Sequence, residues 1–226
     1  MKIDFYNNGG MFQFHNNENL LDLVDFALEH IDEDVFDDIL LLITRTSMEK
    51  LNLYLDVMEL HYVQLDEAKL FNLLKRNFLE VYYSDNLPNL RGAFLEVLSF
   101  NVFRNLYEIF EFSFDCNVCI DGWCSSKTVD VGINCLDYGL VSECKISRKN
   151  FTKDHIGNLL DIKFKSDDFF RLFIISLDNK RELCLKLREI KRDENDLNLD
   201  YINIVHRNNF KEFYLGNYEQ YNDCFS

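Results

Sequence analysis

The chain has 226 residues, of which 47% are hydrophobic and 28% are charged. This is the composition of a globular protein, and it excludes a chain that is disordered throughout. No stretch approaches 18 consecutive apolar residues and no apolar secretory core follows the first residues, so we expect neither a membrane span nor export. Seven cysteines cannot all pair within one chain, so we expect reduced thiols and a cytoplasmic location.

The net charge of −15 is distributed unevenly along the chain. Residues 1–144 hold 9 Lys and Arg against 25 Asp and Glu, residues 145–192 hold 13 against 7, and residues 193–226 hold 2 against 7. The overall acidity argues against non-specific binding of nucleic acid by the whole surface. The basic segment is either a solvated helix face or a strip that contacts phosphates, and the charge pattern alone leaves both interpretations open.

The first 85 residues are predicted to form a hairpin followed by helices. In residues 2–15, Ile3 and Phe5 alternate with polar neighbours ahead of an Asn-Asn-Gly-Gly turn, which indicates a β-hairpin. From Asn17 onward the apolar spacing becomes helical. The periodicity predicts helices over residues 17–31, 34–44, 49–60 and 65–83, with Asn17 or Asn19 as the first cap.

Pro88 marks the best boundary, because it follows one helix and suits the first turn of the next. We therefore predict two domains, residues 1–85 and residues 86–226. The second is expected to contain a helix to about residue 110, strands over 112–120, 128–134 and 140–146, a helix over 154–164, and strands over 172–177 and 183–187. This order predicts an α/β (or α+β) core, a mixed sheet flanked by helices.

Two charged residues stand out on the third predicted strand of that core. Glu143 and Lys145 are two residues apart, so their side chains point to the same face. We expect this face to meet solvent, because an unpaired charge in an apolar core is costly. With Asp130 on the neighbouring strand, they would form a compact acidic cluster with one cation. Such a cluster suits Mg²⁺, which binds carboxylates and keeps waters for a phosphate substrate.

Asp130, twelve intervening residues and Glu143-Cys144-Lys145 together resemble the motif of the PD-(D/E)XK nuclease superfamily. Val129 stands where that signature has a proline, which is a departure from the pattern. Upstream, Arg91-Gly92-Ala93-Phe94-Leu95-Glu96 is similar to a helix motif found ahead of the core in many members. The resemblance covers residues 88–177 and implies a restriction-endonuclease-like core, whereas residues 1–85 resemble no family.

The resemblance also implies a role for each matching residue. Asp130 and Glu143 would hold a divalent cation, Mg²⁺ or Mn²⁺, with the Cys144 backbone carbonyl as a further ligand and Glu96 in or beside this ligand set. Lys145 would orient or help to deprotonate the attacking water, or stabilise the pentavalent phosphorus. The reaction would be phosphodiester hydrolysis. The basic residues that follow the motif strand would contact flanking phosphates, namely Arg148, Lys149 and Lys153.

Several features near the motif have competing explanations. The motif residues themselves also fit a charged surface without catalysis. Asp137 is a rival carboxylate, although turn preference explains its place before a Tyr-Gly pair. Asn158 and Lys163 both lie on the following helix, where the superfamily often carries a polar site residue, and the sequence does not choose between them. Cys116 and Cys119 form a CxxC pair with no fourth ligand at zinc spacing, so we expect ordinary thiols.

Two hypotheses of different classes follow. The first is a metal-dependent endonuclease that acts on DNA rather than RNA, regulated by a protein partner or by homo-oligomerisation, as an effector of bacterial anti-phage defence or restriction. The second is a non-catalytic adaptor on a nuclease-like scaffold that uses its acidic helical surface to bind a basic partner. Convergence of the carboxylates of Glu96, Asp130 and Glu143 would favour the first hypothesis.

Overall fold

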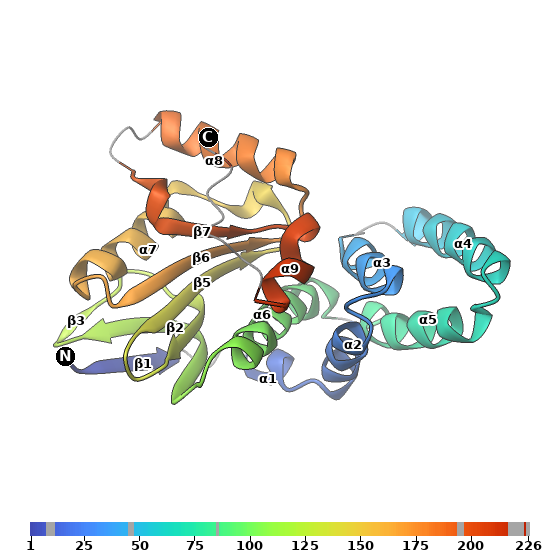
Figure 1. Ribbon diagram of the computed structural model, residues 1–226, viewed down its shortest axis with the longest axis horizontal. Coiled ribbons are helices and arrows are strands. Elements are labelled where there is room, and N and C mark those ends of the chain that lie inside the picture. The colour runs from blue at the N-terminus through green and yellow to red at the C-terminus, as the bar shows by residue number, and fades with distance from the viewer. Residues whose placement is uncertain (8–11, 45–47, 85, 194–196, 217–223, 225–226) are drawn as a thin grey trace. The chain divides into compact units, whose positions relative to one another are not determined.

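The computed structural model describes residues 1–7, 12–44, 48–84, 86–193, 197–216 and 224 (Figure 1). The chain divides into two compact units. The sheet unit contains Met1–Phe12 and Leu95–Ser226, and the helical unit contains Gln13–Phe94. The predicted boundary after residue 85 differs from this division in two respects: the units divide between Phe94 and Leu95, inside helix α6 (Leu87–Leu106), and the first strand of the chain joins the sheet.

The helices of the N-terminal region arise from the predicted apolar periodicity. Asn17 caps the first long helix, because its side chain accepts a hydrogen bond from the Leu20 backbone N–H. Apolar stripes then pack helix against helix, and the Tyr62 hydroxyl donates a 2.7 Å hydrogen bond to Asp38 Oδ2. The helices are α1 (Phe12–His15), α2 (Glu18–Glu29), α3 (Asp34–Ile43), α4 (Met48–Gln64) and α5 (Ala68–Tyr82). No helix among the described residues is long and apolar enough to cross a membrane.

The sheet unit is built on a mixed sheet, which confirms the predicted fold class. Its strand order is β1-β2-β4-β5-β6-β7, and β3, outside this order, pairs with the end of β2. Pairing is antiparallel from β1 through β5 and parallel from β5 through β7. The strands are β1 (Ile3–Asn7), β2 (Glu111–Ile120), β3 (Trp123–Cys124), β4 (Val129–Asn134), β5 (Gly139–Lys145), β6 (Phe170–Ser176) and β7 (Ile202–Val205).

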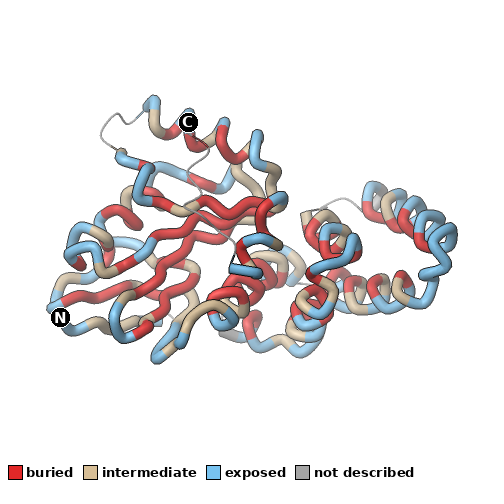
Figure 2. The backbone as a smooth tube through the Cα atoms, in the orientation of Figure 1, coloured by how far each residue is buried: buried red, intermediate tan, exposed pale blue. Residues whose placement is uncertain are grey.

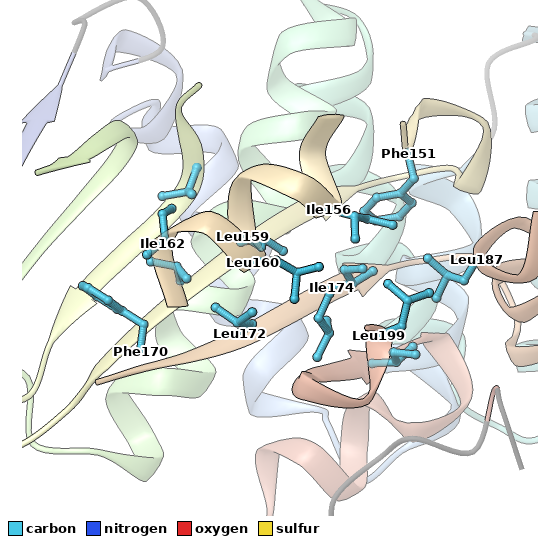
Figure 3. Close-up of a cluster of buried hydrophobic side chains, with 14 of the residues drawn as sticks. Phe151, Ile156, Leu159, Leu160, Ile162, Phe170, Leu172, Ile174, Leu187 and Leu199 are labelled. Carbon is cyan, nitrogen blue, oxygen red and sulfur yellow. The ribbon is translucent and has the colours of Figure 1, made fainter. Parts of the chain in front are cut away.

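Helices connect the parallel strands. α7 (Lys153–Lys165) joins β5 to β6, α8 (Lys180–Asp193) joins β6 to β7, and α9 (Phe210–Tyr214) follows β7. Parallel strands covered by helices are buried on both faces, which explains the nearly continuous apolar run of β6 (Figure 2). The cluster of apolar side chains that α7 and α8 form with these strands includes Phe151, Ile156, Leu159, Phe170, Leu172, Ile174 and Leu187 (Figure 3).

Two local predictions are wrong. β1 does not pair with a strand from residues 12–15, because Ile3 pairs with Ile120 of β2 and residues 12–15 form helix α1. Residues 8–11 of the predicted hairpin lie outside the described residues. Residues 183–187 belong to helix α8 rather than to a strand. The helical spacing of Leu183, Leu187 and Ile190, all buried, decides this.

The expectation of seven reduced thiols is also wrong. Cys119 is bonded to Cys124 between β2 and β3, and Cys184 of α8 is bonded to Cys224. The other cysteines are free and buried, namely Cys116, Cys135 and Cys144. The sequence could not show these pairings, because each depends on which segments the fold brings together.

Candidate functional site

Asp130, Glu143 and Lys145 meet where β4 and β5 part. The pairing of β4 with β5 begins at Val131, which pairs with Ser142. Asp130 therefore lies one residue before the paired part of β4. Lys145 Nζ lies 2.5 Å from Asp130 Oδ2 and 3.0 Å from Glu143 Oε2. The structure therefore brings together three residues that the sequence separates by up to fifteen positions. We call them the Asp-Glu-Lys cluster.

A second hydrogen bond fixes the Asp130 carboxylate. The Cys144 backbone N–H donates to Asp130 Oδ2 over 2.6 Å, so one oxygen accepts from both the backbone and the Lys145 ammonium. The side chains of Asp130 and Lys145 are 16% and 18% exposed. The cluster is thus partly exposed to solvent on the side of these two residues.

Glu143 contradicts the expectation of a solvent-facing charge. Every residue of β5 before Lys145 is buried, and Glu143 is only 1% exposed. Lys145 Nζ lies 3.0 Å from Glu143 Oε2 and compensates the charge of this carboxylate when it is ionised. Burial first, and the Asp130 charge second, raise the pKa of Glu143 well above its ordinary value, while Lys145 opposes that shift.

Burial and the neighbouring charges act in opposite directions on the pKa of Lys145. Burial lowers the pKa of the Lys145 ammonium, but the charges of Asp130 and Glu143 outweigh burial and hold this pKa above its ordinary value. Lys145 therefore remains a cation and a hydrogen-bond donor at neutral pH. It acts here as a donor that organises two carboxylates.

Glu96 lies on α6 and is 7% exposed, so it is buried rather than on the helix surface. Its charge is the weakest of the influences that raise the pKa of Glu143. Within the described parts of the chain, no three His, Cys, Asp or Glu side chains are grouped closely enough to hold a metal ion. The carboxylates of Glu96, Asp130 and Glu143 thus do not form such a group in this arrangement.

Two carboxylates nevertheless suit a magnesium ion, which commonly binds proteins through one or two carboxylates and completes its shell with water and substrate phosphate. Glu143 Oε1 is buried and accepts no hydrogen bond from the described residues, so it has lone pairs available for a cation or a water. Asp130 and Glu143 therefore fit a magnesium ion as a site with two carboxylate ligands. Lys145 currently occupies one oxygen of each.

Arg148, one of the three predicted phosphate contacts, is already paired within the protein. Arg148 Nη2 lies 2.6 Å from Glu182 Oε2, and Nη1 donates to the Glu182 carbonyl oxygen over 3.2 Å. Lys149 and Lys153 are exposed. Lys153 also lines a surface cavity of about 440 Å³ at the start of α7, together with Lys127 and Asn158.

The structure also separates the rival polar residues. Asp137 lies in the turn that joins β4 to β5, at the opposite end of these strands from Asp130 and Lys145. Asn158 is buried and binds the Lys127 backbone with both ends of its amide, accepting over 3.2 Å and donating over 3.1 Å. Lys163 pairs with Asp168 over 3.0 Å. Asn158 thus fixes the segment that leads into β4 and so helps to place Asp130.

Asp178 is a site-forming residue that the sequence analysis missed. It follows β6, and its Oδ2 accepts a 2.5 Å hydrogen bond from the Arg148 backbone N–H. This contact holds the 3-10 turn Arg148–Asn150, which follows β5 and carries Lys149. A carboxylate at the C-terminal end of a parallel strand was the available signal, because ligands of open α/β sheets gather at that edge.

No protein-family profile matches the chain, and no curated protein does. Among solved structures, the chain is similar to the small subunit of the heterodimeric restriction endonuclease R.BspD6I, with 15% identity and a TM-score of 0.40 over 64% of this chain and 78% of that chain. It is also similar to protein VC1899 from Vibrio cholerae, with 14% identity and a TM-score of 0.46 over 98% of this chain and 59% of that chain. The chain thus spans less than two thirds of the Vibrio protein.

Proposed function

We propose that the chain is a metal-dependent nuclease that hydrolyses phosphodiester bonds, with DNA favoured over RNA and internal cleavage favoured over cleavage from an end. The Asp-Glu-Lys cluster carries this proposal. Two carboxylates and one ammonium group meet at a partly open strand end, with Lys145 Nζ 2.5 Å from Asp130 and 3.0 Å from Glu143. The preference for DNA and for internal cleavage rests on the superfamily that the motif resembles.

Each residue of the cluster has a defined part in this chemistry. Asp130 and Glu143 would hold Mg²⁺ or Mn²⁺, with the Cys144 carbonyl as a further ligand. A bound cation supplies charge neutralisation and lowers the pKa of water. Lys145, held as a cation by its two neighbours, donates hydrogen bonds to a phosphate oxygen on which negative charge develops. Water attacks phosphorus, the bond from phosphorus to the leaving oxygen breaks, and that oxygen takes up a proton.

The biological setting belongs to the same proposal. A nuclease that shares a compartment with its host's own nucleic acid must be restrained, and an acidic surface keeps nucleic acid away from most of this chain. We infer that a protein partner or a second copy brings the site to its substrate. A role as an effector of anti-phage defence or restriction fits this arrangement.

A cleavage assay with matched variants tests the proposal. Supercoiled DNA, linear DNA, single-stranded DNA and RNA are incubated with Mg²⁺ or Mn²⁺ and with wild type, Glu143→Gln or Lys145→Ala. Lys165→Ala and Glu111→Gln, both at exposed positions away from the cluster, are the controls. We expect metal-dependent cleavage by wild type and the controls only. Equal cleavage by Glu143→Gln would assign the activity to another site or to a contaminant.

One observation favours the second candidate, a non-catalytic adaptor on a nuclease-like scaffold. Lys145 neutralises part of both carboxylates, and no third acidic side chain within the described residues joins them. Such a cluster also serves as a purely structural ion-pair network. Calorimetric titration with Mn²⁺ separates the two candidates. Binding that Glu143→Gln abolishes favours the nuclease, and absence of binding to well-folded wild type favours the adaptor.

A further inference from the structure

Helix α4 carries two apolar stripes on opposite sides. The buried stripe packs within the helical unit and consists of Leu51, Leu55, Met58 and Tyr62. The exposed stripe consists of Leu53, Val57 and Leu60, which are 63%, 59% and 66% exposed. At about 100° per residue, the centres of the two stripes lie roughly opposite each other around the helix. Figure 2 shows α4 with one buried side and one exposed side.

The exposed stripe has the spacing of a packing face. Single exposed leucines are ordinary on protein surfaces. Leu53, Val57 and Leu60 instead follow the i, i+4, i+7 pattern by which one helix buries itself against another. α4 uses the same spacing on its buried side, where the stripe is covered. The outer stripe therefore has the form of a second helix-packing surface.

The charge around this stripe selects what can cover it. The helical unit, Gln13–Phe94, contains 16 Asp and Glu against 6 Lys and Arg. On α4 itself Asp56 is exposed next to the stripe in sequence, Glu59 is exposed and pairs with Lys75 over 3.2 Å, and Lys50 is exposed as well, so the acidity comes from the unit as a whole. Nucleic acid, an anionic membrane surface and a second copy of this unit would all meet like charge. A partner with basic side chains beside its apolar residues gains both burial and charge pairing.

We propose that Leu53, Val57 and Leu60 form a docking surface for a partner protein that presents an amphipathic helix with Lys or Arg flanking its apolar face. The apolar stripe supplies the buried centre of the contact, and the acidic residues supply its rim. This inference goes beyond the nuclease proposal and does not depend on it, because the stripe lies in the helical unit and the Asp-Glu-Lys cluster lies in the sheet unit.

Binding of a defined peptide tests the surface. The probe is a fluorescent Leu/Lys peptide of about 18 residues, designed as an amphipathic helix, and its binding to the full chain is followed by anisotropy. Two further peptides control for charge and for pattern: one has Glu in place of Lys, and one has the same Leu and Lys residues in scrambled order. We expect saturable binding of the first peptide only.

Variants locate the binding. Leu53→Ser/Leu60→Ser should weaken binding of the Leu/Lys peptide by about tenfold or more. Val57→Lys should weaken it as well by adding a like charge. Leu185→Ser, an exposed leucine on α8 in the sheet unit, is the matched control and should leave binding unchanged. Because these side chains are exposed, circular dichroism should show wild-type helicity for all variants.

Two outcomes would overturn the proposal. Equal binding of the Leu/Lys peptide by wild type and the double variant would show that the peptide adheres to acidic charge alone. Sedimentation showing a dimer of wild type that Leu53→Ser/Leu60→Ser converts to a monomer would assign the stripe to a second copy of the chain. Neither outcome alters the cleavage assay for Glu143 and Lys145, so the two proposals fail separately.

Discussion

Lys145 donates a 2.5 Å hydrogen bond to Asp130 across the parting ends of β5 and β4. The same ammonium lies 3.0 Å from Glu143, so one cation serves two buried or half-buried carboxylates. One positive charge cannot neutralise two negative charges. Burial together with this imbalance explains why the pKa of Glu143 is raised.

Removing the cation should therefore destabilise the fold in a pH-dependent way. The folded state holds the Glu143 proton more tightly than the unfolded chain, so this group favours folding at low pH, and its contribution is lost as the pH rises from 4.5 to about 8. Lys145→Ala raises the Glu143 pKa further. We expect a loss of unfolding free energy of about 3 kcal/mol at pH 8 and a smaller loss at pH 5, where the contact with Asp130 is lost but Glu143 holds its proton.

Urea unfolding measures this effect. Trp123, the only tryptophan, lies on β3 and reports on the sheet unit by fluorescence. Lys165→Ala, which removes an exposed lysine, should change the unfolding free energy little at either pH. A loss for Lys145→Ala that is equal at pH 5 and pH 8 would mean that Lys145 does not compensate the charge of Glu143.

Metal affinity should depend on the protonation of the Glu143 carboxyl group. A cation binds the ionised carboxylate, so Mn²⁺ affinity of wild type should rise between pH 6 and pH 8, and binding should release a proton. Glu143→Gln should weaken binding on the order of tenfold or more and flatten the pH dependence. Calorimetry in buffers of different ionisation enthalpy measures both quantities. Glu111→Gln on β2 is the control. Equal Mn²⁺ affinity of Glu143→Gln and Glu111→Gln would show that Glu143 does not bind the metal.

The helices and the central strands could be predicted because their patterns are local. The Asn17 side chain caps α2 by accepting a hydrogen bond from the Leu20 backbone N–H, three residues along the chain. The apolar periodicity of α5 and α7 marks the face that each helix buries. The antiparallel run of β2, β4 and β5 follows from short connections between alternating segments. The Asp-Glu-Lys cluster was predictable for the same reason, since β4 and β5 are neighbours in sequence and in the sheet.

The features that the sequence could not show are contacts between segments far apart in the chain. The alternation of Ile3 and Phe5 predicts a strand but not its partner, which lies more than a hundred residues away in β2. Likewise, β5 is an interior strand of the sheet, paired with β6 along its whole length, and helices cover the parallel part of the sheet; the residues of β5 alone do not predict this burial of Glu143. The pairing of Cys184 with Cys224 is of the same kind.

Asn158 should matter through the segment that it holds. Both ends of its buried amide bind the Lys127 backbone, so Asn158→Ala removes the partner of the partly buried Lys127 N–H, while the Lys127 carbonyl still accepts from the Ser125 hydroxyl. We expect a loss of unfolding free energy of about 2 kcal/mol. Urea unfolding followed by Trp123 fluorescence measures it, with the exposed Asn150→Ala as the control. An unchanged midpoint would mean that the Lys127 segment does not need this clamp.

The two disulfides should differ in their contribution to stability. Cys184 and Cys224 are 40 residues apart, whereas Cys119 and Cys124 are 5 apart, and a longer loop restricts the unfolded chain more. Under oxidising conditions we expect Cys184→Ser to cost about 4 kcal/mol and Cys119→Ser about 2 kcal/mol. Both differences should vanish with reductant. Mass spectrometry after alkylation of unreduced, unfolded protein should find three modified cysteines, and seven would show that neither bond forms.

The residues after β5 should contribute unequally to nucleic-acid binding. Arg148 is held by Glu182 at 2.6 Å, so its charge is already compensated, whereas Lys149 is exposed on the turn that Asp178 fixes. Lys149→Gln should therefore lower the slope of log affinity against log salt by about 0.9, the value for one phosphate contact. Arg148→Gln should change that slope much less. Anisotropy of a labelled duplex at several KCl concentrations measures both, with Lys165→Gln as the control, and the reverse ranking would place the substrate against Arg148 instead.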